Sequence, residues 1–176
     1  MIFPQSKIPP AMTLTQQMVY TGNAFRMFHE ITVPAESEAY IGIQNGENSV
    51  HLFSRLVRST LPDVRYEVRS GHVVSAGGEG AAVSTVFNMN GNSNVQSTNS
   101  VRIITAVDSL GDLKDIDIVG GALTVGNRPQ SDTLKDPDDL KVLPPNVDFL
   151  LRFVNPNTDP ADVLLYLKWF ETAKAD

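Results

Sequence analysis

The sequence predicts an all-β protein: an antiparallel β-sandwich or jelly roll preceded by an extended N-terminal arm. Some nine or ten short apolar segments recur at intervals of about 8–15 residues, a rhythm typical of sandwiches and jelly rolls rather than of alternating strands and helices. The segment VRYEVRS, residues 64–70, alternates strictly between apolar and charged side chains, as a half-buried antiparallel strand does. Because neither a repeat nor a linker interrupts this pattern, we expect one domain over residues 19–176.

Residues 1–18 form the predicted arm. Three prolines in the first ten residues disfavour a regular helix, yet the segment is too apolar for a free solvated tail. We expect the arm either to pack along its own domain or to lie on a neighbouring subunit. Its candidate contacts with a partner are Ile2, Phe3, Ile8, Met12 and Leu14.

The first half of the predicted domain consists of strands joined by turns. The strands are expected at residues 25–33, 39–44, 50–57 and 64–70. A turn signal, QNGENS, separates the second strand from the third, and Gly71 ends the fourth.

The second half begins with two short apolar runs around a glycine loop, within residues 72–88, and a polar Asn/Ser-rich loop, Asn88 to Ser100. A strand is predicted at residues 101–107, and a hairpin of DIDIV and ALTVG around Gly120-Gly121. A long loop with a helical turn near Pro137 to Leu140 then leads to the closing segment.

The closing segment, residues 146–171, allows two interpretations. Asp159 and Pro160 resemble the N-cap and first position of a helix. However, a helix over residues 162–171 would be apolar nearly all round and would need complete burial, which a chain made of strands does not offer. We therefore predict that VDFLLRFVN and DVLLYLKWFE are two strands of a hairpin. The second strand then has Val163, Leu165, Leu167 and Trp169 on one face and Leu164, Tyr166, Lys168 and Phe170 on the other.

Composition excludes several classes of function. The chain has no cysteine, which excludes disulfides, thiolate metal sites and cysteine nucleophiles. Its net charge of −6 argues against general binding to nucleic acid. No stretch approaches the ~20 apolar residues that cross a membrane, and the N-terminus lacks the apolar run of a signal peptide. We expect no membrane partner and synthesis in the cytoplasm.

The search for catalytic or metal-binding motifs gives no strong candidate, so we predict no enzyme activity, cofactor or metal. The three histidines, His29, His51 and His72, lie more than twenty residues apart without ligand spacing. The glycine-rich stretches lack the residues of a phosphate-binding loop. Eight aspartates cluster between Asp108 and Asp139. A solvated acidic loop explains them, and calcium binding by Asp132 and Asp136 is the alternative.

Four arginines lie within fifteen residues: Arg55, Arg58, Arg65 and Arg69. One interpretation is an exposed sheet face balanced by Glu67 and nearby acids. The other is a basic patch that meets the Asp-rich region of another subunit, where complementary charge fixes orientation. We retain the four as candidate contacts with a partner.

Three stretches resemble the capsid decoration, or cement, proteins of tailed bacteriophages. They are MVYTGNAFR before the first strand, the loop FNMNGNSNVQSTNS, and the closing LPPNVDFLLRFVNPNTDPADVLLYLKWFE. In the closing pair, Phe149 takes the aromatic position, Asn155 the turn, and Trp169 and Glu171 the terminal motif. The resemblance covers both ends of the chain and the overall rhythm, and it favours the strand interpretation of residues 162–171.

The resemblance implies a structural role in the virion. A decoration protein binds the outside of an assembled capsid, bridges neighbouring capsomers and stabilises the mature head. The expected partners are the major capsid protein and further copies of the chain, with a trimer preferred because capsids offer three-fold sites. The alternatives are another virion β module, such as a head-fibre base, tail adaptor or receptor-binding domain, and a non-viral β-sandwich binding module.

Overall fold

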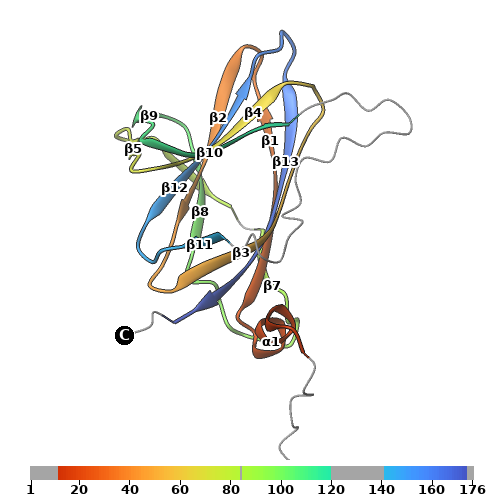
Figure 1. The fold of residues 1–176 in the computed structure, drawn as a ribbon. Coiled ribbons are helices and arrows are strands. Elements are labelled where there is room, and N and C mark those ends of the chain that lie inside the picture. Colours follow the sequence, from red (N-terminus) through yellow and green to blue (C-terminus); the bar gives the residue numbers. More distant parts are fainter. Residues whose placement is uncertain (1–11, 84, 120–140, 174–176) are drawn as a thin grey trace, which may run out of the picture.

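A computed structural model describes residues 12–83, 85–119 and 141–173. These residues form a β-sandwich of two antiparallel sheets with one short helix (Figure 1). The predicted fold class, all-β with antiparallel sheets, is confirmed. The expected hairpin partner at residues 122–126 and the helical turn near Pro137 lie outside the described residues.

The helix and the first strands are α1 (Leu14–Thr21), β1 (Ala24–Val33), β2 (Ser37–Gln44), β3 (Ser49–Ser59) and β4 (Val64–Ser70). Short strands follow: β5 (Val73–Val74), β6 (Glu79–Ala82), β7 (Val86–Asn88), β8 (Ser100–Ile104) and β9 (Val107–Ser109). The last strands are β10 (Asp112–Val119), β11 (Lys141–Leu143), β12 (Asp148–Asn155) and β13 (Ala161–Thr172).

Pairing between the first four strands and the last four is nested. Strand β1 pairs with β13, β2 with β12, β3 with β11 and β4 with β10, all antiparallel. The first sheet, sheet A, has the order β11-β3-β13-β1-β7, and the second, sheet B, has the order β10-β4-β12-β2-β8-β6. Consecutive strands from β1 to β4 and from β10 to β13 therefore alternate between the two sheets.

The closing segment forms strands, as predicted, but it does not form a hairpin. Strand β12 lies in sheet B between β2 and β4, whereas β13 lies in sheet A between β1 and β3. Both are central strands whose two edges already have partners, so the turn between them crosses from one sheet to the other. The turn is built on Asn155, whose buried side-chain amide donates to the carbonyls of Val33, Pro34 and Asp159 at 3.2, 3.1 and 2.8 Å.

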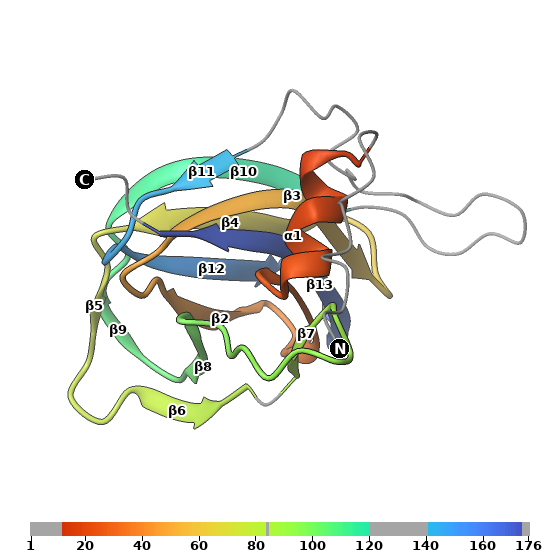
Figure 2. The same cartoon turned by 90° about the horizontal axis from the view of Figure 1, so that it is seen from below.

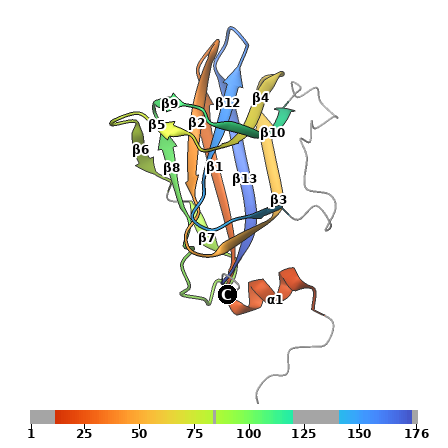
Figure 3. The same ribbon diagram turned by 60° about the vertical axis from the view of Figure 1, so that its left-hand side comes forward.

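The segment between β4 and β10 adds strands to both sheets at the β1/β2 side of the sandwich. Strand β7 extends sheet A beside β1, and β8 with β6 extends sheet B beside β2. The β5/β9 pair packs on the outer face of sheet B, where Val74, Val107 and Leu110 contact a cluster of Tyr40, Ile104 and Leu150. Figure 3 shows these added strands on the side of the sandwich away from β3.

Helix α1 corrects the prediction of an extended arm through residue 18. Thr13 caps the helix: its hydroxyl accepts from the backbone N–H of Gln16 at 3.3 Å, and the Gln16 side chain accepts from the Thr13 N–H at 2.9 Å. This capping box is visible in the sequence as T-L-T-Q, and the three prolines that disfavour a helix all precede it. Gly22 ends the helix at φ +80. The helix lies at the end of the sandwich where β1 begins (Figure 2).

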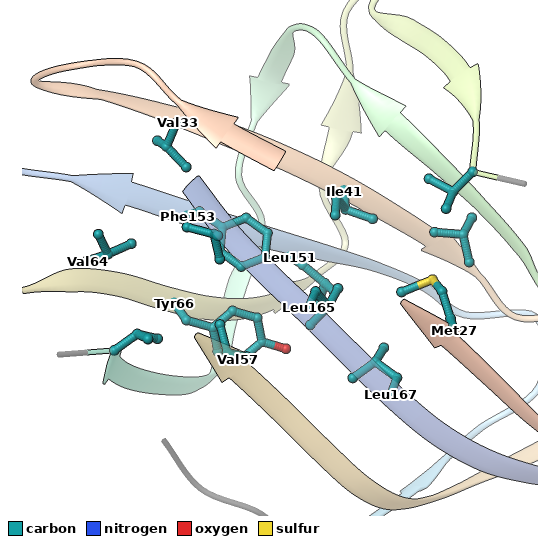
Figure 4. Close-up of a cluster of buried hydrophobic side chains, with 14 of the residues drawn as sticks. Met27, Val33, Ile41, Val57, Val64, Tyr66, Leu151, Phe153, Leu165 and Leu167 are labelled. Atoms are coloured by element: carbon teal, nitrogen blue, oxygen red, sulfur yellow. The ribbon is translucent and has the colours of Figure 1, made fainter. Parts of the chain in front are cut away.

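The core lies between the sheets and follows the predicted alternation. In β13 the inward Val163, Leu165 and Leu167 are buried, while the outward Leu164 and Tyr166 are half-buried. The core extends from Val33, Val64 and Phe153 to Met27 and Leu167, all of them buried (Figure 4). Full burial of such a side chain stabilises the fold by about 1.5–3 kcal/mol.

Candidate functional site

The four arginines do not form one patch. A β-bulge at Phe53 reverses the alternation in β3, because Trp169 pairs with Leu52 and Lys168 with Ser54. Arg55 therefore points between the sheets, where it forms an ion pair with Asp115 at 2.7 Å. Arg58 lies exposed on the opposite, outer face of sheet A. The prediction of a single exposed arginine face is wrong for this reason.

Arg65 and Arg69, in contrast, share the outer face of sheet B with Glu67. They contact its two carboxylate oxygens at 2.9 and 2.7 Å. Arg152 of the neighbouring strand adds a third contact at 3.1 Å and also pairs with Glu38. Of the four arginines singled out in the sequence, Arg65 and Arg69 thus pair with Glu67, as expected.

Charge sets the protonation of this network. Burial alone would raise the pKa of Glu67, but hydrogen bonds and charge from Arg69 and Arg152 outweigh it and hold the pKa below its ordinary value of 4.5. Burial, followed by hydrogen bonding and charge from Glu38, raises the pKa of Tyr40 to about 12. Glu67 therefore remains ionised and Tyr40 neutral throughout the neutral pH range.

Glu171 is also a buried carboxylate, and the donors that bind it among the described residues are neutral. Its Oε1 accepts hydrogen bonds from Ser97, Asn99 and the indole of Trp169 at 2.5, 3.2 and 3.1 Å. Its Oε2 accepts from the backbone N–H and the hydroxyl of Thr98 at 3.0 and 2.8 Å. The Trp-x-Glu motif thus fastens the end of β13 to the Asn/Ser-rich loop.

The same loop also holds helix α1. The side-chain amide of Asn88 donates to the carbonyl of Gly22 at 2.7 Å, and that of Asn90 donates to the carbonyl of Tyr20 at 3.0 Å. Gly22 cannot be replaced freely, since a Cβ there would lie 2.2 Å from the Ser93 hydroxyl. Asn88 and Asn90 of this loop therefore have structural partners inside the protein.

Outward side chains form an apolar row across the middle of sheet A. Leu56, Tyr166 and Phe28 occupy paired positions on β3, β13 and β1. Phe87 of β7 extends the row, because its ring stacks on Phe28 with centroids 5.9 Å apart. Phe28 and Phe87 are 47% and 43% exposed. We call these four residues the aromatic row.

Cationic side chains flank the aromatic row. Arg26 and Lys168 pair across β1 and β13 on one side of it, and Lys168 lies 5.2 Å from the centre of the Tyr166 ring. Arg58 lies on the other side, next to Leu164 of β13. Exposed aromatic side chains rimmed by polar groups are typical of surfaces that bind another protein.

A cavity of about 380 Å³ lies between the sheets, at the end that contains Met27 and Leu167. Its walls are mostly apolar inward side chains, including Met27, Leu151 and Leu167, which Figure 4 shows pointing between the sheets. Its polar lining includes Asn45 and the Arg55–Asp115 ion pair. The cavity was not predicted, because alternation assigns residues to the interior without giving the distance between the sheets.

The remaining candidates are not gathered into one site. Ile2, Phe3 and Ile8 lie outside the described residues, as do Asp132 and Asp136 and with them the calcium alternative. Met12 is half-buried and Leu14 is 52% exposed. Among the side chains that the structure describes, no three His, Asp or Glu are grouped to hold a metal.

The histidines lie in three separate places. Burial lowers the pKa of each of them. His51 on sheet A stacks on Phe170 with ring centroids 4.6 Å apart and contacts the Thr172 hydroxyl at 2.8 Å. Each histidine is therefore neutral near pH 7, and His51 packs against Phe170.

Sequence reasoning missed the aromatic row and Asn45. A signal for the row was present, since Phe28 and Tyr166 both occupy outward positions of predicted strands. Only the pairing of β1 with β13 brings them together, and the sequence does not state that pairing.

Comparison of the chain with known protein families, with curated proteins and with solved structures gives no significant match. No helix among the described residues is long and apolar enough to cross a membrane.

Proposed function

We propose that the protein is a structural component of a tailed-bacteriophage virion, which binds the outside of the assembled capsid, bridges capsomers and stabilises the mature head. The observation that carries the proposal is the nested strand pairing, β1 with β13 through β4 with β10. This order supports the finer assignment of the sandwich as a jelly roll, an architecture that viral capsid proteins share with lectins and cupins.

The closing motif supports the same proposal. Three residues that carry the resemblance to decoration proteins have structural roles within this fold. Asn155 fixes the crossing between the sheets, and Trp169 with Glu171 fixes the Asn/Ser-rich loop. These residues therefore belong to the construction of the sandwich, and the capsid-binding surface must be sought elsewhere.

The outer face of sheet A is the surface that we assign to the capsid. Its aromatic row supplies the apolar centre of an interface, and Arg26, Arg58 and Lys168 supply a mostly cationic rim that also contains Glu30. Buried aromatic residues at the centre of an interface contribute most of its binding energy. The corresponding capsid surface should therefore be apolar with acidic neighbours.

Self-association completes the proposal. We expect a homo-oligomer, with a trimer preferred because it matches the three-fold sites of a shell. The N-terminal segment is the element that we expect to contact a neighbouring subunit. Arms of this kind bind by wrapping a neighbour and lose conformational entropy in doing so.

Co-sedimentation with capsids of the phage that encodes the protein tests the proposal. The purified protein should bind expanded shells with a fixed copy number for each capsomer and should not bind immature shells. Saturation at micromolar protein is expected. Absence of binding to either shell would overturn the proposal and would favour a tail adaptor, fibre base or receptor-binding role instead.

A further inference from the structure

We infer that the cavity between the sheets is a binding site for a small neutral molecule that is mostly apolar and carries one hydrogen-bond donor, such as a medium-chain alcohol. The inference is independent of capsid binding, because the cavity opens between the sheets and the aromatic row lies on an outer face. The volume of about 380 Å³ falls in the range of ligand sites. An apolar cavity of about 150 Å³ is enough to bind benzene.

Asn45 supplies the polar end of the site. It lines the cavity and is 2% exposed. Its amide nitrogen donates to the carbonyl of Pro144 at 3.0 Å, which fixes the orientation of the amide. The amide oxygen is buried and has no hydrogen-bond partner in the part of the chain that the structure describes. A buried oxygen without a donor is costly, so a ligand hydroxyl that donates to it gains affinity.

Charge around the cavity selects a neutral ligand. Arg55 forms its ion pair with Asp115 at 2.7 Å, and the exposed Lys114 contacts Asp112 at 3.5 Å. A carboxylate entering the cavity would compete with Asp115 for Arg55 and would lose its hydration. An alcohol does not compete for Arg55 and has no charge whose hydration is lost.

Trp169 is the single tryptophan of the chain, and it lines the cavity. It is 4% exposed, so its fluorescence reports on the interior. A ligand that carries a heavy atom will quench this fluorescence when it occupies the cavity. The probe is 10-bromo-1-decanol, and the comparison compounds are its methyl ether, which lacks the donor, and 10-bromodecanoate.

The experiment titrates the full chain with each compound and follows Trp169 emission. The alcohol should quench saturably at micromolar concentration, with the ether and the carboxylate each binding about tenfold more weakly, the loss expected for one hydrogen bond of about 1.4 kcal/mol. Linear quenching without saturation, or tighter binding of the carboxylate, would overturn the inference.

Two variants locate the site. Val68→Phe fills the cavity from β4 and should abolish saturable quenching, whereas Ile118→Phe, on an exposed position of β10, should leave it unchanged. Asn45→Leu should bind alcohol and ether equally, a change in selectivity that a general loss of structure would not produce. Circular dichroism and thermal unfolding show whether each variant folds. Equal quenching in folded Val68→Phe and in the unmodified protein would place the probe elsewhere and overturn the inference.

Discussion

The two outer faces of the sandwich differ in what their aromatic and charged side chains contact. On sheet B, the middle row across the strands is Tyr40, Arg152 and Glu67, and these side chains bind one another or Glu38. The β5/β9 pair covers the adjacent Leu150. On sheet A, the middle row is Leu56, Tyr166 and Phe28, and Phe28 is 47% exposed.

We infer from this difference that the outer face of sheet B contributes mainly to fold stability and the outer face of sheet A mainly to binding. The polar groups of sheet B are satisfied within the chain, so this part of its surface has no need of a partner. The aromatic row of sheet A leaves apolar area in water that a further molecule can cover. We therefore expect changes in the Glu67 network of sheet B to alter folding and changes in the aromatic row of sheet A to alter binding.

The largest expected effect is on binding. Replacing both exposed aromatics, Phe28→Ser with Phe87→Ser, should weaken capsid binding by about 1000-fold, since two central hot-spot residues contribute about 2 kcal/mol each. The unfolding free energy should change far less. Co-sedimentation of the variant with expanded capsids measures the loss.

The control for this pair is Ile116→Ser with Ile118→Ser, on the outer face of β10, where the two side chains are 50% and 63% exposed. This variant should bind as the unmodified protein does. If it loses binding and the phenylalanine pair does not, the docking face is the edge of sheet B, and the comparison of the two faces is reversed.

The next largest effect is on folding. Glu67→Gln leaves three arginines without their shared carboxylate and should lower the unfolding free energy by roughly 3 kcal/mol, as urea denaturation would measure. Glu79→Gln is the matched control, because its ion pair with Arg102 is exposed and 3.5 Å long and should contribute less than about 1 kcal/mol. Equal losses of unfolding free energy in the two variants would show that burial of Glu67 does not increase its contribution to stability.

A smaller effect is expected at the end of the sandwich. Glu171→Gln replaces one acceptor oxygen by an NH₂ group that faces the donors of Thr98. We expect a loss of about 2 kcal/mol in unfolding free energy and greater protease sensitivity in residues 88–100. Capsid binding by the folded variant should be unchanged, because Glu171 lies away from the aromatic row. Cleavage at the rate of the unmodified protein would contradict the anchoring role.

The smallest effect is the dependence of stability on pH. Burial lowers the pKa of His51 in the folded protein, so the unfolded chain binds its proton more readily. Stability from His51 should therefore be complete above its ordinary pKa of 6.5 and decline as pH falls below that value. The contribution of Glu67 should persist until the pH falls below about 4.5, since its folded pKa is lowered and the unfolded chain takes up the proton first.

Thermal unfolding between pH 4 and 8 measures both contributions. His51→Phe should reduce the decline below pH 6.5 and leave the decline below pH 4.5 in place. Glu67→Gln should do the opposite. A His51→Phe profile that matches the unmodified protein would show that His29 and His72 account for the first decline.

Alternation of apolar and polar residues predicts the longer strands β1 to β4, β12 and β13. It does not predict the short ones: residues 101–107, expected as one strand, divide between β8 and β9, and β11 lies in the stretch expected to be a loop. The bulge at Phe53 turns Arg55 inward, and the sequence does not reliably indicate a bulge. Thr13 and Gln16 mark the start of α1, although the prolines before them favour an extended segment.

The candidate surfaces depend on long-range pairing, which the sequence does not specify by itself. Phe28 and Tyr166 become neighbours through the β1/β13 register, across 138 positions of the chain (166 − 28). The cavity depends on the separation of two sheets near Asn45. The residue pattern within one strand indicates neither which strand it pairs with nor how far apart the sheets lie.

Electron cryo-microscopy of expanded capsids saturated with the protein tests the central claim most directly. Our account predicts density on the outer surface of the shell, at the junctions between capsomers, with the aromatic row of sheet A facing the capsid and the β5/β9 pair facing away. Density confined to the tail, or a shell that is bare outside at saturating protein, would contradict it.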